Sequence, residues 1–346
     1  MAVRAARHLR TPSRTRTRIV LGAWLALQLA APPATHAGEY RSLFDGLEAT
    51  LYVPEPLSAS PALVVALHGC NQEASDYDDE TGWTALADEL GFLLLLPQQG
   101  VTNNPMRCFN WMLPGHRERG RGEPAAVMAL VDEVQADYPV DASRLFVTGL
   151  SAGGAMAAVL LATYPERFAA GAVIAGLPYR CVTTRTTMAS VQAATVCMSQ
   201  GNRLVEDAQE WARRVRAASD YAGERWPRVS IWYGSDDTVV DPINAVDLMR
   251  QWTAVHGADQ EPDATEETEG YVHRVYRDTR GQAVVELWEV KDLGHAVPID
   301  EETECGVDSG GGFLAWFMPW WGEDYVEDVG LCASRRIARF WGLQTP

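Results

Sequence analysis

The sequence predicts an α/β fold: a single, doubly wound, mostly parallel sheet. Apolar runs of strand length, such as Ala62 to Leu67 and Phe92 to Leu96, alternate with segments of helical spacing, such as Ala125 to Tyr138 and Ala152 to Tyr164. Runs that are apolar at every position suit strands buried on both faces, and strands that alternate with helices build parallel sheets. With 346 residues, 47% of them hydrophobic, the chain can form a large core.

The remaining elements follow the same alternation. Residues 39–53 are expected to form an early strand, and Pro97 is expected to end the strand that begins at Phe92. Further strands are predicted over 144–148, 173–175, 229–233 and 283–290, and a helix over 83–90. The acidic stretch 259–269 is expected to be a solvated surface loop. The aromatic segment 310–321 is either a buried loop over the core or an exposed apolar lid.

The first 37 residues have the composition of a secretory signal peptide. They hold six arginines and no acid, then an apolar run from Ile19 to Ala31, and they end in small residues at Ala37. The apolar run is too short to span a bilayer comfortably as a stable helix. After removal of the signal peptide, no membrane insertion of the mature chain is expected. We therefore predict a signal peptide over 1–37 and one catalytic domain over 38–346, in a periplasmic or extracellular protein.

The net charge and the cysteines exclude some kinds of partner and indicate disulfide bonds rather than a metal site. The net charge of -17 argues against nucleic-acid and anionic-membrane partners, which select clustered positive charge. Six cysteines after a signal peptide indicate up to three disulfides, whereas no cysteine or histidine spacing is typical of a zinc site. We expect no metal and no cofactor. The six are Cys70, Cys108, Cys181, Cys197, Cys305 and Cys332.

The pentapeptide Gly149-Leu150-Ser151-Ala152-Gly153 is the strongest functional signal. It lies between an apolar strand and an alanine-rich helix, where the nucleophile elbow of an α/β-hydrolase lies. The glycines suit a strained turn with close backbone packing. A serine at this place can also be an ordinary helix N-cap. In the context of the strand and helix, we predict Ser151 to be the nucleophile of a serine esterase.

A serine nucleophile needs a histidine base and a carboxylate that orients it, in the chain order Ser, acid, His. His295 follows the predicted strand 283–290 in a loop, whereas His256 and His273 look like surface residues. After the strand that ends near residue 233, Asp237 is the preferred acid, ahead of Asp236 and Asp241. Aspartates in turns often bond only local backbone, so the choice among the three stays open here.

Two backbone N–H groups must hold the oxyanion. One is predicted to come from Ala152, which follows the nucleophile, and the other from the loop after an early strand. In His68-Gly69-Cys70, the Cys70 amide is the preferred donor, and His68 is expected to support the loop.

The chain resembles the polyhydroxybutyrate (short-chain polyhydroxyalkanoate) depolymerase family of α/β-hydrolase esterases. The resemblance covers about Leu63 to Leu343. It is carried by Leu67–Gln72, Asn104–Trp111, Gly122–Pro124, Gly149–Met156, Gly294–Asp300, Cys332–Ser334 and Ile337–Leu343.

The resemblance implies a triad of Ser151, Asp237 and His295, because Gly234, Asp237 and Val240 match the family's Gly-x-x-Asp-x-x-Val pattern. It also implies disulfides Cys70–Cys108 and Cys305–Cys332, which leaves Cys181 with Cys197. Trp111, beside the oxyanion segment, is a candidate wall of the acyl pocket or a core residue.

The implied activity is hydrolysis of polyhydroxyalkanoate polymer or oligomer through an acyl-enzyme. Three departures from the family pattern bear on it: Tyr233 where histidine is usual, a longer segment over 315–328, and no polymer-binding domain after Leu343. The last favours soluble oligomers or amorphous polymer. Feruloyl or acetyl-xylan esterase, aromatic polyester hydrolase and a non-catalytic binding protein are the alternatives. The oligomeric state is left open.

Overall fold

The strands of the chain assemble into one large sheet with a parallel centre and antiparallel edges. The computed structural model describes residues 38–201, 207–303, 305–306 and 325–344. Within these residues ten strands form the sheet, and the central six run parallel to one another. In sheet order they are β1 (Glu39–Phe44), β2 (Glu48–Val53), β4 (Leu93–Gln98), β3 (Leu63–Leu67), β5 (Leu145–Gly149), β6 (Ala170–Ile174), β7 (Arg228–Gly234), β10 (Ala283–Val290), β9 (Tyr271–Arg277) and β8 (Ala264–Glu267).

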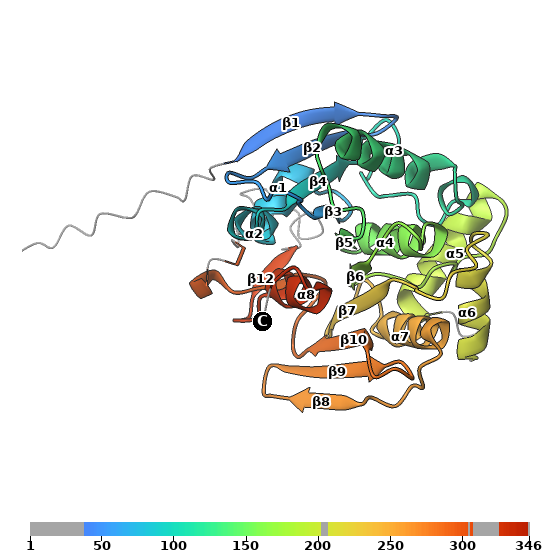
Figure 1. The fold of residues 1–346 in the computed structure, drawn as a ribbon. Coiled ribbons are helices and arrows are strands. Elements are labelled where there is room, and N and C mark those ends of the chain that lie inside the picture. Colours follow the sequence, from blue (N-terminus) through green and yellow to red (C-terminus); the bar gives the residue numbers. More distant parts are fainter. Residues whose placement is uncertain (1–37, 202–206, 304, 307–324, 345–346) are drawn as a thin grey trace, which may run out of the picture. The chain divides into compact units, whose positions relative to one another are not determined.

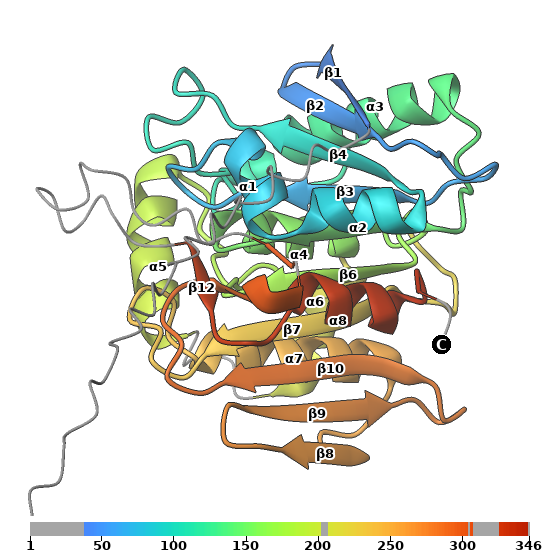
Figure 2. The same cartoon turned by 90° about the vertical axis from the view of Figure 1, so that its left-hand side faces the viewer.

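Helices cover both faces of this sheet (Figure 1), as the doubly wound prediction requires. One face carries α1 (Ala74–Glu80), α2 (Trp83–Leu90) and α8 (Ala333–Trp341), which lie in front of the sheet in Figure 2. The other face carries α3 (Gly122–Asp137), α4 (Ala152–Thr163), α6 (Ala208–Arg216) and α7 (Ile243–His256), with α5 (Thr187–Gln200) beside them. The remaining elements are η1 (Pro114–His116), η2 (Glu301–Thr303) and the small parallel pair β11 (Val297–Ile299) and β12 (Val326–Asp328).

The apolar runs of the sequence are the strands that face both cores. In β3, Leu63, Val65 and Leu67 pack toward α3 and α4, whereas Val64 and Ala66 pack toward α1 and α2. Successive side chains of a strand point to opposite faces, so a strand between two helical layers must be apolar throughout. The predicted fold class is therefore confirmed.

Three local predictions were wrong. The early strand is a hairpin, because Gly46 at φ +70° turns the chain between β1 and β2. Part of the acidic stretch forms β8, an exposed edge strand paired with β9. Pro97 does not end β4. The Leu93 N–H donates to Ala62 on the β3 side, so the backbone nitrogens of residues 93, 95 and 97 face that side. Because the pairing with β3 stops at Leu95, the missing N–H of Pro97 costs no hydrogen bond of the sheet.

Three disulfides cross-link the loops. Cys70 pairs with Cys108, Cys181 with Cys197, and Cys305 with Cys332, with Cα–Cα distances of 4.2, 6.3 and 5.7 Å. These are the pairs that the family resemblance implies. All of the described residues belong to one compact unit. The predicted signal peptide and the aromatic segment 310–321 lie outside the described residues. None of the described helices has the length and apolarity that a membrane crossing requires.

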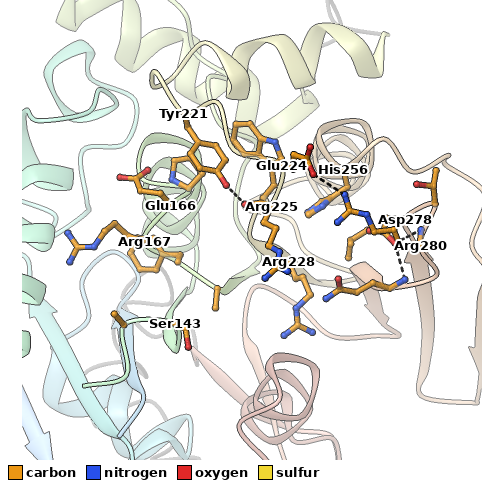
Figure 3. A pocket seen from close by; sticks show the side chains of 18 residues that line it. Ser143, Glu166, Arg167, Tyr221, Glu224, Arg225, Arg228, His256, Asp278 and Arg280 are labelled. Atoms are coloured by element: carbon orange, nitrogen blue, oxygen red, sulfur yellow. Dashed lines mark hydrogen bonds and ion pairs between the residues drawn. The ribbon is translucent and has the colours of Figure 1, made fainter. Parts of the chain in front are cut away.

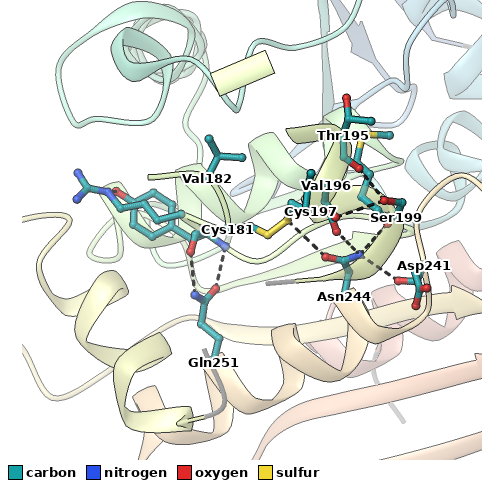
Figure 4. The surroundings of a disulfide bond; sticks show 12 residues. Cys181, Val182, Thr195, Val196, Cys197, Ser199, Asp241, Asn244 and Gln251 are labelled. Carbon is teal, nitrogen blue, oxygen red and sulfur yellow. Dashed lines mark hydrogen bonds between the residues drawn. A yellow bond between two sulfur atoms is a disulfide. The ribbon is translucent and has the colours of Figure 1, made fainter. Parts of the chain in front are cut away.

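The Cys181–Cys197 disulfide joins the loop after β6 to α5, and α7 supports both partners (Figure 4). The side-chain amide of Gln251 exchanges two hydrogen bonds with the Tyr179 backbone, at 2.9 and 3.0 Å. The side-chain amide of Asn244 donates to the Cys197 carbonyl at 3.1 Å. The loop and helix are thus held by covalent and polar contacts together.

Candidate active site

Ser151 occupies a strained turn between β5 and α4. Its backbone has φ 56° and ψ -117°, a conformation that L-residues rarely adopt. Its N–H donates to the Ile174 carbonyl on β6 at 2.9 Å, which ties the turn to the neighbouring strand. The residue is only 8% exposed. A strained serine at the carboxyl end of a central parallel strand is the geometry of a nucleophile elbow.

Glycines on either side allow this turn because backbone crowds against them. A Cβ at Gly149 would lie 2.5 Å from the Gly153 carbonyl carbon, and one at Gly153 would overlap the Leu67 carbonyl oxygen at the end of β3. Leu67 is also paired with Gly149 in the β3–β5 register. The start of α4 therefore packs directly on the carboxyl end of β3.

Asp237 and His295 are in contact. His295 Nδ1 lies 2.8 Å from Asp237 Oδ2, and their side chains are 6% and 0% exposed. The other carboxyl oxygen of Asp237 accepts hydrogen bonds from the Val239 and Val240 N–H groups, both at 2.9 Å. A carboxylate can only accept, so it receives the Nδ1 proton and leaves the Nε2 lone pair of His295 available to act as a base.

The loops that carry these two residues are interlocked at the carboxyl ends of β7 and β10. Ser235 N–H donates to the Val290 carbonyl at 2.9 Å, and Asp236 N–H donates to the Leu293 carbonyl at 3.0 Å. Asp292, at φ +60°, donates its N–H to Ser235 Oγ at 2.9 Å. These three hydrogen bonds fix the loop that leads to His295 relative to the loop that carries Asp237.

The carboxyl groups of the other two aspartates of the acid loop accept hydrogen bonds from residues close to them in the sequence. Asp236 is exposed, and its carboxyl group accepts a hydrogen bond from Ser235 Oγ at 3.0 Å. Asp241 Oδ1 accepts from the Ile243 N–H at 2.9 Å, at the start of α7. The structure therefore brings one of the three candidate acids to His295.

His256 and His273, which look like surface residues in the sequence, are partly buried in the structure. His256 Nε2 bonds the Pro227 carbonyl at 2.9 Å, and burial lowers the pKa of His256 to about 4. His273 stacks on Trp288 at 3.8 Å and bonds the buried Glu286 at 3.0 Å. Both are structural because neighbouring elements, which an isolated strand or helix pattern does not reveal, cover them.

The predicted oxyanion donors lie at the ends of two adjacent strands, β3 and β5. Among the hydrogen bonds of the described residues, neither the Cys70 nor the Ala152 N–H has an acceptor within the protein. The segment around Cys70 is held on both sides: Gly69 N–H donates to Gln72 Oε1 at 2.7 Å, and Asn71 N–H donates to the Met106 carbonyl at 2.8 Å. The supporting role of Gln72 was not foreseen from the sequence, although Gln72 stands in a block of the family pattern.

His68 and Trp111 are buried beside this segment. His68 Nε2 accepts the Gln99 N–H at 3.0 Å, its Nδ1 lies 2.6 Å from the Gly69 carbonyl oxygen, and burial lowers its pKa to about 4. His68 is thus the neutral support that the sequence predicts. Trp111 is 6% exposed and packs in the core on the α3 and α4 side.

One cavity lies at the amino-terminal ends of β7 and β10, away from the loops that carry Asp237 and His295, and Figure 3 shows the side chains that line it. It has a volume of about 760 Å³, and its charged side chains come from the amino-terminal ends of β7 and β10 and from the loops around them, among them Arg228, His256 and Arg280. It contains none of the predicted site residues. A smaller hollow of about 340 Å³ lies against Asn71, next to Cys70, and Tyr325 and Val101 also line it. In the described ranges, no three His, Cys, Asp or Glu side chains are grouped to hold a metal ion.

The chain matches the family described as esterase PHB depolymerase over residues 47–270. It is 38% identical over 296 residues to poly(3-hydroxyalkanoate) depolymerase C of Paucimonas lemoignei, covering 84% of this chain and 66% of the relative. It is 32% identical over 255 residues to an acetylxylan esterase of Coprinopsis cinerea, covering 72% of this chain and 65% of that protein. The chain thus spans just under two thirds of the length of these two relatives.

Two further relatives are also named as esterases. Feruloyl esterase B of Talaromyces stipitatus is 29% identical over 286 residues, covering 82% of this chain and 77% of that protein. The solved acetyl xylan esterase from Aspergillus awamori superposes with a TM-score of 0.68 at 27% identity, covering 77% of this chain and 97% of that one. The sequence pattern, the sheet with its elbow, and these similarities agree: the chain belongs to the PHB depolymerase family of esterases and has the α/β-hydrolase fold.

Proposed function

We propose that this protein hydrolyses the ester bonds of poly- or oligo(3-hydroxyalkanoates), such as 3-hydroxybutyrate polymer, through an acyl-enzyme on Ser151. The contact between Asp237 and His295 supports the chemistry, because it leaves a basic nitrogen on the histidine of a chain that also carries a nucleophile elbow. The similarity to the depolymerase of Paucimonas lemoignei supports the substrate class.

The proposed reaction has two halves. His295 Nε2 takes the Ser151 hydroxyl proton as Ser151 Oγ attacks the ester carbonyl, and the Cys70 and Ala152 N–H groups hold the oxyanion. The same proton passes to the leaving alcohol as the acyl-enzyme forms. Water then attacks the acyl group with His295 as base, which releases the acid and restores Ser151. Asp237 stabilises the charged imidazole in both halves. The Ser151 proton thus leaves with the alcohol, a proton from water replaces it through His295, and the reaction involves no change of oxidation state.

An uncharged helix face near the acid loop supports a neutral, apolar substrate. In α5, Met188, Val191 and Val196 are more than half exposed, and the helix has no charged residue in a chain of net charge -17. The Met198 carbonyl of α5 accepts the Asp241 N–H at 2.8 Å, which joins this helix to the loop that carries Asp237. Exposed apolar patches on a secreted enzyme are typical of contact surfaces for hydrophobic ligands.

The test is release of 3-hydroxybutyrate by the purified protein from the soluble trimer and from amorphous granules. Ser151→Ala is expected to abolish release, and Ser143→Ala, in an exposed turn before β5, is expected to retain it. Wild-type protein that releases no 3-hydroxybutyrate from either substrate would contradict the proposed substrate. The ratio of trimer to granule rates distinguishes oligomer from polymer hydrolysis.

The second candidate is a carbohydrate esterase, which the similarity to the acetyl xylan esterase from Aspergillus awamori favours. Methyl ferulate and acetylated xylan are therefore run beside the hydroxybutyrate substrates. Turnover of these alone would preserve the proposed chemistry and change the substrate. Wild-type protein that neither cleaves an ester nor reacts with a fluorophosphonate would instead favour a non-catalytic binding protein.

We also propose that residues 1–37 are a signal peptide and that the mature protein acts outside the cytoplasm. The three disulfides support this proposal, because such bonds persist in oxidising compartments. N-terminal sequencing of the secreted protein is expected to begin at Gly38. A protein recovered with an intact N-terminus from the cytoplasm of its own host would contradict it.

A further inference from the structure

Glu123, in the first turn of α3, is a buried carboxyl group held entirely by neutral donors. Its residue is 3% exposed. Oε1 accepts from Gln99 Nε2 at 2.5 Å, from Asn103 Nδ2 at 3.0 Å and from Asn110 Nδ2 at 2.6 Å, and Oε2 accepts from the Asn110 backbone N–H at 2.6 Å. The two carboxyl oxygens of Glu123 thus accept four N–H groups, so the side chain acts as a hydrogen-bond acceptor at both ends.

A buried carboxylate without a cationic partner lowers the stability of the folded state. Among the described residues, no lysine or arginine pairs with Glu123; the one ionisable side chain in contact is His116, whose Nδ1 lies 3.4 Å from Oε1. Taking a carboxylate out of water carries a large desolvation penalty, and an apolar side chain of similar volume is often at least as stable. The helix dipole favours a carboxylate in the first turn of α3, but this modest gain does not require the group to be buried and held by four donors from another segment.

The donors all belong to one loop, residues 99–111, which Glu123 organises from within. Asn110 Oδ1 accepts a further hydrogen bond from Asn104 Nδ2 at 2.9 Å, which closes the part of the loop between residues 104 and 110. Two residues before Asn110, Cys108 forms the disulfide with Cys70. Arg107, at φ +51°, completes the turn that leads to it.

The same loop sets the orientation of the proposed oxyanion donor. Cys70 is bonded to the loop through Cys108, and its neighbour Asn71 donates its N–H to the Met106 carbonyl at 2.8 Å. Asn71 is itself at φ +61°, in the left-handed region that asparagine tolerates better than most residues. The Cys70 N–H itself belongs to the preceding peptide, whose Gly69 carbonyl oxygen lies 2.6 Å from His68 Nδ1. His68 Nε2 in turn accepts the N–H of Gln99, the first residue of the 99–111 loop, at 3.0 Å, so the loop holds the peptides on both sides of Cys70.

We infer that Glu123 is a positioning residue for catalysis: by holding the 99–111 loop it directs the Cys70 N–H at the oxyanion. This inference rests on the proposed acyl-transfer function. It also assigns a role to the Gly122-Glu123-Pro124 block, which has none in the proposed mechanism. Loss of one complete oxyanion donor lowers kcat roughly 10²–10³-fold, and misdirection of that donor loses part of this.

The decisive variant is Glu123→Gln, which keeps the shape of the side chain and replaces one acceptor oxygen by a donor. Each carboxyl oxygen of Glu123 accepts at least one N–H, so the new amide faces a donor in either orientation. We expect kcat for p-nitrophenyl butyrate to fall about 10- to 100-fold with KM changed less than threefold. The affinity for a trifluoromethyl ketone, whose adduct with Ser151 carries an oxyanion, should fall by the same factor.

The matched control is Glu133→Gln, the same change at an exposed position of the same helix, with kcat expected within twofold of wild type. Asn110→Ser serves where Glu123→Gln does not fold: it removes the side-chain bond to Oε1 and keeps the residue's backbone N–H. It should lower kcat and the ketone affinity together, by a smaller factor. All rates are measured at least 15 °C below each variant's Tm.

Two results would overturn the inference while leaving the proposed function intact. One is a folded Glu123→Gln or Asn110→Ser protein with wild-type kcat. The other is a kcat loss without a matching loss of ketone affinity, which would be a general structural effect. Failure of the proposed function is distinguishable, because then the wild-type protein would cleave no ester at all.

Discussion

Replacing Asp237 by asparagine tests the proposed triad most sharply, because the structure determines how the new side chain must lie. Asp237 Oδ1 accepts the Val239 and Val240 N–H groups at 2.9 Å each. The asparagine carbonyl oxygen will keep these two bonds. Its NH₂ group then faces His295 Nδ1, where Asp237 Oδ2 now lies at 2.8 Å.

A donor at this place forces the other imidazole tautomer. His295 Nδ1 must accept, so its proton moves to Nε2, and the lone pair that would take the Ser151 proton is lost. In serine hydrolases this tautomer error lowers kcat about 10⁴-fold. We expect a loss of about 10³–10⁴-fold in kcat, which corresponds to roughly 4–5.5 kcal/mol of transition-state stabilisation.

The assay is hydrolysis of p-nitrophenyl butyrate across pH 6 to 10, with kcat and KM determined separately. Asp236→Asn and Asp241→Asn are the matched controls, because each makes the same chemical change in the same loop. Asp236 is exposed and Asp241 bonds the start of α7, so each variant should retain kcat within about threefold. A larger loss in either control than in Asp237→Asn would refute the assignment of the acid.

Three further changes test the scaffold. Gly153→Ala places a methyl group against backbone oxygens at the end of β3, so it should abolish esterase activity and lower the Tm, and a fully active variant would contradict the elbow packing. Replacing Cys181 and Cys197 by serine opens a loop of sequence separation 16; we expect a loss of about 3 kcal/mol in chemical denaturation with little change in kcat at 25 °C, against which an unchanged unfolding midpoint would count. Burial raises the pKa of Asp78 to about 7, so between its unfolded pKa near 3.8 and pH 7 the unfolded chain releases a proton that the folded protein keeps, and rising pH removes stability. Asp78→Asn should therefore raise the Tm more at pH 8 than at pH 4, and the matching difference in the free energy of unfolding should be a few kcal/mol at most. An equal Tm change at both pH values would contradict this.

Much of the fold was predictable because its signals are local. The apolar runs that became β3, β4 and β5 must be apolar at every position, since helices cover both faces of the sheet. The helix Trp83–Leu90 and the strand Ala283–Val290 have the predicted bounds. Signals that depend on pairing were missed: the β1–β2 hairpin and the β8 edge strand owe their form to partner strands.

In the candidate site, the elbow could be located from the sequence because Gly149, Ser151 and Gly153 are close in the chain and the strained turn requires glycines on either side of the serine. The sequence by itself also determined a short set of acids and histidines, from their order after strands. The choice among them depended on tertiary structure: the interlocked loops after β7 and β10 bring Asp237 to His295, and burial makes His256 structural. Glu123 stands in a block of the family pattern, but the residues around it in sequence do not indicate what its carboxyl group does. Its four donors come from a loop 13 to 24 residues away, and only folding brings them to one carboxylate.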